Sequence, residues 1–407
     1  MSGPELLTFG CRLNLAESEA MRVAAADQDD LVIVNSCAVT AEAARQAAQA
    51  IRRAHRRRPD ARIVVTGCAA QVEPGRFAAM AEVSAVVGNA DKHDPAAFRA
   101  YAPRVRVSDV MQVARLAPQL VEAFAEHARA FIEVQNGCDH ACTFCVIPQG
   151  RGPSRSLPLA HVVEQVARAA AAGHREAVLT GVDLTSWAED GMRLGHLCAA
   201  ILARTSIQRL RLGSLDPVEV DDGLFDLLAN EPRMMPHVHL ALQHGADLIL
   251  KRMKRRHLAA QAIRLVERLK AQRDIAVGAD LIAGFPTETA EHHAANLALL
   301  DSCDVTFAHI FPYSPRPATP AARMPQLDGA TIKARAAALR TRAAIRKAAW
   351  LDRQIGTVAH VLIERDGLTG HAANFARVRL PAATAANTLL PLRIVARDGD
   401  TLLGTPA

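Results

Sequence analysis

Short apolar runs alternate with amphipathic stretches along most of the chain, which predicts β-strands separated by α-helices. In the first third these runs are LLTFG, LVIVNS and RIVVTG, and each ends at a small residue followed by a cysteine. The stretch Ala41–Arg58, after the second run, has a helical pattern. Repetition of strand and helix predicts a parallel sheet in this region.

The pattern resumes near Arg129, where helical stretches such as Leu159–Ala172 and Leu258–Gln272 separate further apolar runs. These runs are FIEVQ, EAVLTGV, RLRLGSL, HVHLAL, AVGADLIAGF and VTFAHIF. Six strand–helix units predict a partial barrel, open where a full barrel has eight strands. Because ligands meet such barrels at the carboxyl ends of the strands, residues at those ends are candidate site residues.

A long helix is predicted over Ala330–Arg353, and the pattern of apolar and polar residues changes after it. TVAHVLIERD, HAANFARVRL and LLPLRIVARDGDTLLG have the pattern of short strands and turns, typical of a small β-barrel. The predicted fold class is therefore α/β. It comprises an N-terminal parallel α/β sheet domain (1–92), a linker without clear period (93–128), a central partial (β/α)6 barrel (129–354) and a small C-terminal β-barrel (355–407).

Composition narrows the class of protein. Half of the 407 residues are hydrophobic, and the net charge of +6 is compatible with an RNA partner without establishing one. The N-terminus lacks the pattern of a secretory signal and no apolar run has spanning length, so we expect no membrane partner. Eight cysteines are few for this length and six lie in motifs, which favours a reduced, cytoplasmic protein with metal-binding cysteines.

The stretch QNGCDHACTFCVIPQGRG carries Cys138, Cys142 and Cys145 on one short loop. Three thiolates suit three irons of a four-iron cluster, which normally takes four, so one iron stays open to an outside ligand. The alternative is a structural zinc site with His140 as fourth ligand. The spacing C-x3-C-x2-C is not the usual spacing of a zinc knuckle.

A second triplet is expected from the fold. Cys11, Cys37 and Cys68 each follow a predicted parallel strand, and such strands end along one edge of the sheet. The three thiols should therefore converge, although any one of them taken alone is better interpreted as a buried small hydrophobe. We predict that role for Cys198 and Cys303.

The cysteine loop, with Phe144 before its third cysteine, resembles that of the radical S-adenosylmethionine (SAM) enzymes. TFGCRLNLAESEAM, VNSCAVT and VTGCAAQVEP resemble the N-terminal domain of the methylthiotransferases, the group that inserts a methylthio unit into an unactivated C–H bond. The resemblance implies SAM and two [4Fe–4S] clusters, one on each triplet, with the edge of the sheet facing the top of the barrel. It also implies an electron donor such as flavodoxin or ferredoxin.

LTGVDL, SLDP, LQHG and GFPTET resemble the family's motifs on successive barrel strands. This implies a SAM site formed by Phe144, Gly181, Ser214, Gln243, Asp280 and Gly284. The family form has glycine in place of Thr287, and glycine readily takes a positive φ, so this departure bears on the shape of the loop. LKRMKRRH resembles a motif near the substrate cavity and is predicted to begin a helix. His237, His239, His244 and His309 are interpreted as barrel residues rather than metal ligands.

The substrate is inferred from the branch that the motifs resemble. TFGCRLNLAESE, with Glu17 and Glu19, looks most like the branch that methylthiolates C2 of N6-threonylcarbamoyladenosine at position 37, in the tRNA anticodon loop. Sibling branches act on isopentenyl-adenosine in tRNA or on an aspartate of a ribosomal protein. An alternative of another class is a non-enzymatic iron–sulfur protein that binds RNA or senses redox state.

The C-terminal segment resembles the TRAM module, an RNA-binding appendage of this family. Phe375, Arg377 and Arg379 are its best candidates for RNA contacts through stacking and charge. The alternative is a plain capping domain.

Overall fold

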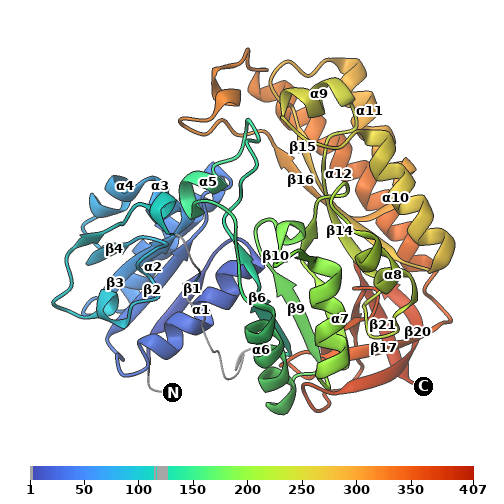
Figure 1. Ribbon diagram of the computed structural model, residues 1–407, viewed down its shortest axis with the longest axis horizontal. Helices are drawn as coiled ribbons and strands as arrows, with labels where there is room; N and C mark the ends of the chain where they lie inside the picture. The colour runs from blue at the N-terminus through green and yellow to red at the C-terminus, as the bar shows by residue number, and fades with distance from the viewer. Residues whose placement is uncertain (1–2, 114–115, 117–126) are drawn as a thin grey trace.

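The N-terminal region folds around a five-stranded parallel sheet (Figure 1). The structure is a computed structural model that describes residues 3–113, 116 and 127–407. The strands follow chain order across the sheet: β1 (Glu5–Thr8), β2 (Leu31–Ser36), β3 (Arg62–Gly67), β4 (Ala85–Val87) and β5 (Val105–Arg106). The three predicted strands and the parallel sheet are confirmed.

Helices cover both faces of this sheet. Helix α1 (Arg12–Ala24) belongs to the core that contains Leu31 and Ile33 of β2. Helix α2 (Ala41–Arg57) belongs to the opposite core, with Val32 and Val34. Because alternate residues of a strand point to opposite faces, β2 is buried on both sides, which explains its continuous apolar run.

The sheet takes in part of the segment that the sequence predicts as a connection. A 3-10 turn, η1 (Pro95–Phe98), buries Phe98 in the sheet core, and β5 pairs with β4. Residues 95–106 are therefore part of this layer rather than linker. A four-residue turn and a two-residue strand are too short to show a period.

Two parallel sheets form the central region. One has the order β12-β9-β6 and the other β13-β14-β15-β16, and every neighbouring pair is parallel. The sheets adjoin at Gly213, which separates β12 from β13. The bounds are β6 (Arg129–Glu133), β9 (Glu176–Thr180), β12 (Arg209–Leu212), β13 (Ser214–Leu215), β14 (His237–Gln243), β15 (Ala276–Ala283) and β16 (Val305–Pro312). All six predicted runs are strands, and we call these sheets the central sheets.

Helices α6 (Leu159–Ala171) and α10 (Ala259–Gln272) confirm the predicted helical stretches. The others of the central region are α7 (Leu194–Arg204), α8 (Asp222–Asn230), α9 (Asp247–Arg252), α11 (Ala290–Ser302) and α12 (Gly329–Asp352). The prediction that LKRMKRRH begins a helix is wrong, because α9 ends inside it at Arg252 and Lys254 has φ +56°. Cations at a helix C-terminus complement the negative end of the helix dipole.

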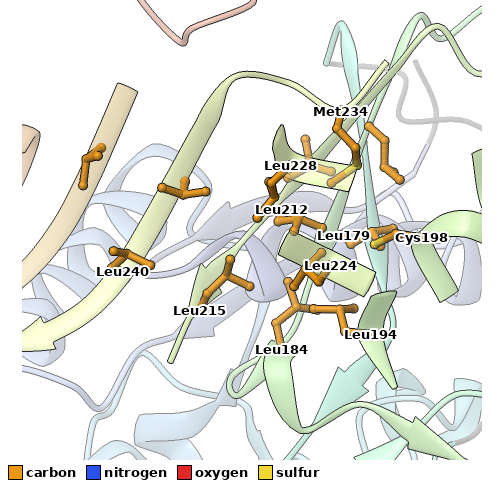
Figure 2. Close-up of a cluster of buried hydrophobic side chains, with 14 of the residues drawn as sticks. Leu179, Leu184, Leu194, Cys198, Leu212, Leu215, Leu224, Leu228, Met234 and Leu240 are labelled. Carbon is orange, nitrogen blue, oxygen red and sulfur yellow. The ribbon is translucent and has the colours of Figure 1, made fainter. Parts of the chain in front are cut away.

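The apolar core of the central region lies between its strands and helices. Figure 2 shows Leu179, Leu212 and Met234 near Cys198 of α7, all fully buried or nearly so. Cys303 is buried in the same core. The prediction that both cysteines are core residues is confirmed.

A closed five-stranded barrel follows α12, in the order β17-β18-β19-β21-β20. Its strands are β17 (Val358–Ile363), β18 (Thr369–Ala372), β19 (Arg377–Arg379), β20 (Leu389–Asp398) and β21 (Thr401–Pro406). Figure 1 shows the barrel (red) below the central sheets, and Trp350 and Leu351 of α12 share its core. In the described part of the chain, no helix is both long and apolar enough to cross a bilayer.

Phe375 lies between β18 and β19 and packs against the central strands. Its ring centroid is 4.9 Å from that of His237 and 5.8 Å from that of Phe307, both on central strands. The prediction that Phe375 stacks on RNA is therefore wrong, because its ring is packed in the interface between the C-terminal barrel and the central strands. Arg377 and Arg379 are exposed.

Candidate active site

The three N-terminal cysteines lie at one edge of the first sheet. Cys11 and Cys37 follow the ends of β1 and β2, and Cys68 begins α3 (Cys68–Val72) directly after β3. Ser36 pairs with Gly67 in register, so the cysteines that follow these two residues leave the sheet side by side. The predicted placement of all three at strand ends is confirmed.

Close approach of the chain brings these thiols together. A Cβ on Gly10 would lie 2.8 Å from the Sγ of Cys37, so only glycine fits beside Cys11. Cys37 is buried, and burial together with the charge of Cys68 raises the pKa of its thiol to about 12. Thiolates that repel one another in this way suit a cationic iron centre, which binds cysteine as thiolate.

The second triplet lies on a loop after β7 (Gln135–Asn136). The amide of Ile147 donates to the Sγ of Cys145 and that of His140 to the Sγ of Cys138, both at 3.4 Å. Burial and the nearby Cys142 raise the pKa of Cys145 to about 12. Burial also raises the pKa of Cys142, but hydrogen bonds from His140 and Arg255 outweigh it and hold that pKa below the ordinary value.

Glycines close this loop. Gly137 has φ +76°, and a Cβ on it would lie 1.8 Å from the carbonyl oxygen of Pro153. The amide of Cys138 donates to the carbonyl of Gly152 at 3.1 Å, which ties the start of the loop to its end. Every described cysteine is a free thiol, so both triplets are available as ligands. Three thiols at each place fit a [4Fe–4S] cluster with one open iron.

His140 does not complete a four-ligand set with the three thiols. Its Nε2 lies 3.1 Å from the Oδ2 of Asp183, and it groups with Cys138 and Asp183 alone as a possible ligand set. Zinc prefers four ligands in tetrahedral array. The geometry therefore favours three-cysteine ligation over the zinc alternative.

Helix α5 (Ile147–Arg151) joins the two triplets. It begins two positions after Cys145, and a Cβ on its Gly150 would lie 3.4 Å from the Cβ of Cys68. The Nε of Arg151 donates to the Sγ of Cys68 at 3.1 Å. The sheet edge with the first triplet thus packs against the segment after the second.

A buried ionic group holds Arg151 in place. Its Nη1 donates to the Oε1 of Glu17 at 2.7 Å, and its Nη2 donates to the Oδ1 of Asn14 at 2.6 Å. Lys92 lies 2.6 Å from the other carboxylate oxygen of Glu17. Burial opposes ionisation, but Arg151 and Lys92 hold the pKa of Glu17 well below its ordinary value. Sequence reasoning did not assign these contacts, and only the run of polar residues in α1 hinted at them.

The six residues predicted to contact SAM occupy different positions around the central sheets. Phe144 packs against Phe285 with ring centroids 6.5 Å apart. A Cβ on Gly181 would lie 2.8 Å from the Oε1 of Gln135, so the close approach there requires glycine. Ser214 has a buried hydroxyl without a hydrogen-bond partner among the described residues. Such an orphaned donor suits a polar ligand.

Gln243 and Gly284 have positive φ angles of 64° and 73°. A Cβ on Gly284 would lie 2.7 Å from the Cγ1 of Ile332 on α12, so the close packing of α12 there requires glycine. The amide of Gly284 and that of Phe285 donate to Glu288, at 2.7 Å and 3.1 Å. The carboxylate of Glu288, which sequence reasoning did not single out, therefore shapes this loop.

Thr287 has the positive φ angle that the family's glycine at this position would readily take. It has φ +68°, the left-handed region in which the family's glycine is at ease. Arg252 donates to its Oγ1 at 2.7 Å. The threonine therefore takes a strained backbone angle and gains a hydrogen bond.

Asp280 lies between two histidines from neighbouring strands. Its Oδ1 is 2.9 Å from the Nε2 of His239 and 3.1 Å from the Nδ1 of His309. Burial opposes ionisation, but these hydrogen bonds hold the pKa of Asp280 below its ordinary value. Both histidines lie on central strands, and with Asp280 they form a group that could hold a metal ion, so their interpretation as barrel residues rather than metal ligands stays a prediction.

Three guanidinium groups surround the ring of Phe375 where the central strands begin. The Cζ atoms of Arg211, Arg12 and Arg129 lie 5.0, 5.3 and 5.6 Å from its centroid. Burial and the charges of Arg129 and Arg211 lower the pKa of Arg12 to about 10. Arg12, which directly follows Cys11, thus reaches from the edge of the first sheet to the central strands.

Comparisons with known proteins agree with this arrangement. Residues 132–300 match the radical SAM superfamily, and residues 5–88 match the family described as Uncharacterized protein family UPF0004. The solved structure of the radical SAM methyltransferase TsrM from Kitasatospora setae, with cobalamin and a [4Fe–4S] cluster bound, has a TM-score of 0.54 and 19% identity. The match covers 79% of this chain and 77% of that one, and it shows a shared fold.

Curated relatives match nearly the whole chain. The threonylcarbamoyladenosine tRNA methylthiotransferase MtaB of Rickettsia prowazekii is 42% identical, over 96% of this chain and 94% of that protein. The tRNA-2-methylthio-N(6)-dimethylallyladenosine synthase of Cereibacter sphaeroides is 34% identical, over 88% of this chain and 87% of that protein. The chain therefore belongs to the radical SAM tRNA methylthiotransferases, enzymes that use SAM and two [4Fe–4S] clusters.

Proposed function

We propose that this enzyme methylthiolates C2 of N6-threonylcarbamoyladenosine at position 37 of tRNA, beside the anticodon. The observation that carries this choice is the 42% identity to the Rickettsia protein over 96% of this chain, since that protein is named for this nucleoside. The cytoplasm, where tRNA is modified, is the proposed place of action.

Cys138, Cys142 and Cys145 hold the cluster that binds SAM in this proposal, and Cys11, Cys37 and Cys68 hold the second. The cluster on Cys138, Cys142 and Cys145 would supply reductive cleavage of SAM to a radical, and the cluster on the other triplet would supply the sulfur for transfer. The contacts of α5 support this assignment because they join the two triplets through Gly150 and Arg151. A substrate base held between the triplets reaches both.

The chain itself binds and orients SAM and the base. The free hydroxyl of Ser214 and the backbone turn at Gln243 are proposed to meet polar parts of SAM. Phe144 closes the cysteine loop against Phe285 and excludes water from it. Gly181 admits the side chain of Gln135, whose Oε1 accepts from the amides of Val182 and Asp183 at 3.1 Å and 2.9 Å. Asp280 and Gly284 complete the proposed set.

We propose the domain division 1–92, 93–128, 129–354 and 355–407, with residues 95–106 packed on the first domain. The central sheets together form a partial (β/α)6 barrel in this proposal, because their strands run in chain order and in parallel. The C-terminal barrel acts as a TRAM module, with exposed Arg377 and Arg379 toward RNA. An electron donor such as flavodoxin or ferredoxin reduces the first cluster.

A second candidate substrate is isopentenyl-adenosine in tRNA. The Cereibacter relative, named for dimethylallyladenosine, favours it at 34% identity over 88% of this chain. The aspartate of a ribosomal protein has no such support among these relatives. The non-enzymatic sensor is set aside because the family consists of enzymes.

Reconstituted, reduced enzyme with SAM tests the proposal on two anticodon stem-loop RNAs. One carries N6-threonylcarbamoyladenosine and the other isopentenyl-adenosine at the same position. We expect 5′-deoxyadenosine, and the 2-methylthio product in the first RNA only, by nucleoside mass spectrometry. Methylthiolation of the second RNA alone would overturn the proposed substrate.

Cysteine variants assign the two clusters. Cys142→Ala should abolish 5′-deoxyadenosine formation. Cys37→Ala should halve the iron content and keep 5′-deoxyadenosine formation, but yield no methylthio product, because one of two four-iron clusters is lost. Cys198→Ala, in the core, is the control and should keep both clusters. Methylthiolation by Cys37→Ala at the wild-type rate would refute the assignment of the first triplet.

A further inference from the structure

Arg12 is a cation between the first sheet and the central strands. It follows Cys11 at the edge of the first sheet and begins α1. Its guanidinium lies within electrostatic reach of Arg129, Arg211, Glu176 and Asp280, which belong to four central strands. The side chain is only partly exposed. The Arg12 side chain therefore points toward the central strands.

The charges around Arg12 do not balance. Arg129 pairs with Glu364 at 3.1 Å, and Arg209 and Arg211 share Glu176 at 3.7 Å and 2.7 Å. His239 and His309 occupy Asp280. Arg12 has no hydrogen bond or ion pair to any residue that the structure describes, so four guanidiniums face three carboxylates and one cation is left over.

Other polar atoms around the same ring also lack partners. The Nη1 of Arg211 and the Nδ1 of His237 are buried without a hydrogen bond among the described residues. Arg211 and His237 both flank Phe375, as Arg12 does. Buried polar groups without partners are costly, and a ligand is one way to satisfy them. The set of one free cation and two unpaired nitrogens favours an anionic ligand.

We propose that Arg12 is a specificity-determining residue that binds the carboxylate of the threonyl group on the substrate base. This inference rests on the proposed function. The threonylcarbamoyl substituent carries a carboxylate, whereas the isopentenyl substituent is a hydrocarbon. A guanidinium binds a carboxylate through two parallel hydrogen bonds. Arg12 follows Cys11 in the chain, so one segment carries both a cysteine of the triplet proposed to deliver sulfur and the proposed contact to the carboxylate.

The test compares two stem-loop RNAs that differ in one group. One carries N6-threonylcarbamoyladenosine, and the other carries its neutral carboxamide in place of the threonyl carboxylate. Wild-type enzyme should prefer the acid by about 10- to 100-fold in kcat/KM, the range expected for a charge-assisted hydrogen bond. The kcat/KM of Arg12→Gln should fall by about that factor with the acid RNA and should not change with the amide RNA. Arg12→Lys, which keeps the charge, should recover part of the preference.

Controls separate recognition of the carboxylate from other roles of Arg12. Arg204→Gln, at an exposed arginine on α7, should keep the full preference of the wild type. Iron content and 5′-deoxyadenosine formation should be equal in wild type and Arg12→Gln. If Arg12→Gln loses iron, Arg12→Lys, which keeps the charge, replaces it in the comparison of acid and amide and should show a reduced preference for the acid.

Three outcomes would overturn it. Equal kcat/KM values for the acid and amide RNAs with wild-type enzyme would show that the enzyme does not recognise the carboxylate. A loss of equal size on both RNAs in Arg12→Gln would indicate a phosphate contact or a structural role. A change confined to the KM for SAM would assign Arg12 to the cofactor. Failure of wild-type enzyme to methylthiolate the acid RNA at all, with activity on the isopentenyl RNA, would instead refute the proposed function.

Discussion

The Nε of Arg151 lies 3.1 Å from the Sγ of Cys68, although 83 positions separate the two residues in the chain. Arg151 ends the helix that follows the cysteine loop, and Cys68 belongs to the other triplet. One side chain thus spans the interface at which both triplets meet. Its position is set by Glu17 and Asn14 of α1, which hold the rest of the guanidinium.

Arg151→Met should destabilise the first domain and its contact with α5. Arg151 and Glu17 are both buried, and removing one partner of a buried pair costs about 3–5 kcal/mol. Lys92 remains as partner of Glu17, so we expect the lower end of that range. Urea unfolding measures the loss, with Arg76→Met, at an exposed arginine, as control. An unchanged midpoint would contradict the structural role.

Arg151→Lys tests the contact with Cys68 itself. A lysine is a single point of charge and does not reproduce the planar fork of donors. In a Cys142→Ala background, which isolates the second cluster, this variant should keep the iron content but shift the electron paramagnetic resonance signal. An identical signal would show that the bond to Cys68 does not reach the cluster.

The contribution of Glu176 to stability should depend on pH. Arg211 lowers the pKa of this buried carboxyl from 4.5 to about 2, against the effect of burial. A depressed pKa means that the stabilisation is complete above pH 4.5 and is lost as the pH falls toward 2. The full effect is on the order of 3 kcal/mol.

Glu176→Gln measures this effect by difference. The variant should be less stable than wild type at neutral pH, by about 3 kcal/mol or more, since Arg211 loses its charged partner. The gap should narrow at acid pH because the wild-type carboxyl also becomes neutral. Urea titrations of both proteins at pH 7 and near pH 3 measure this difference in the free energy of unfolding. A gap of constant size would rule out the linkage.

Thr287→Asn should stabilise the loop after β15. Threonine is β-branched and holds φ +68° here, whereas asparagine tolerates the left-handed region. The amide oxygen of asparagine also remains an acceptor for Arg252. We expect a gain of about 1 kcal/mol in the free energy of unfolding. Thr289→Asn, at an N-cap with φ −89°, is the matched control and should be nearly neutral.

Phe375→Ala should loosen the C-terminal barrel from the central sheets. The ring contacts His237 and Phe307 and lies under three guanidiniums, so its loss costs about 2–4 kcal/mol. Limited proteolysis between α12 and β17 should become faster. Arg377→Ala, two positions away and exposed, should leave the cleavage rate unchanged. Equal rates in both variants would show that Phe375 does not hold the interface.

Local pattern was sufficient for much of the fold. The positions of Cys11, Cys37 and Cys68 followed from strand ends in a parallel sheet, and the loop of Cys138 was visible as spacing alone. The missed elements were short, such as β5, or depended on where a helix stops, as at Arg252. A period needs several residues to show, so two-residue strands leave no trace in it.

The sequence by itself determined the two cysteine triplets, the parallel strands that carry them and the family to which they point, because each rests on local spacing or on the regular geometry of strands. Only the tertiary structure decided what lies between these parts. Arg151 reaches Cys68, Arg12 has no ion-pair partner among the described residues although Asp280 is within electrostatic reach, and Phe375 packs into an interface instead of meeting RNA. These contacts join residues from separate domains, and packing of the domains sets them, whereas spacing along the chain does not.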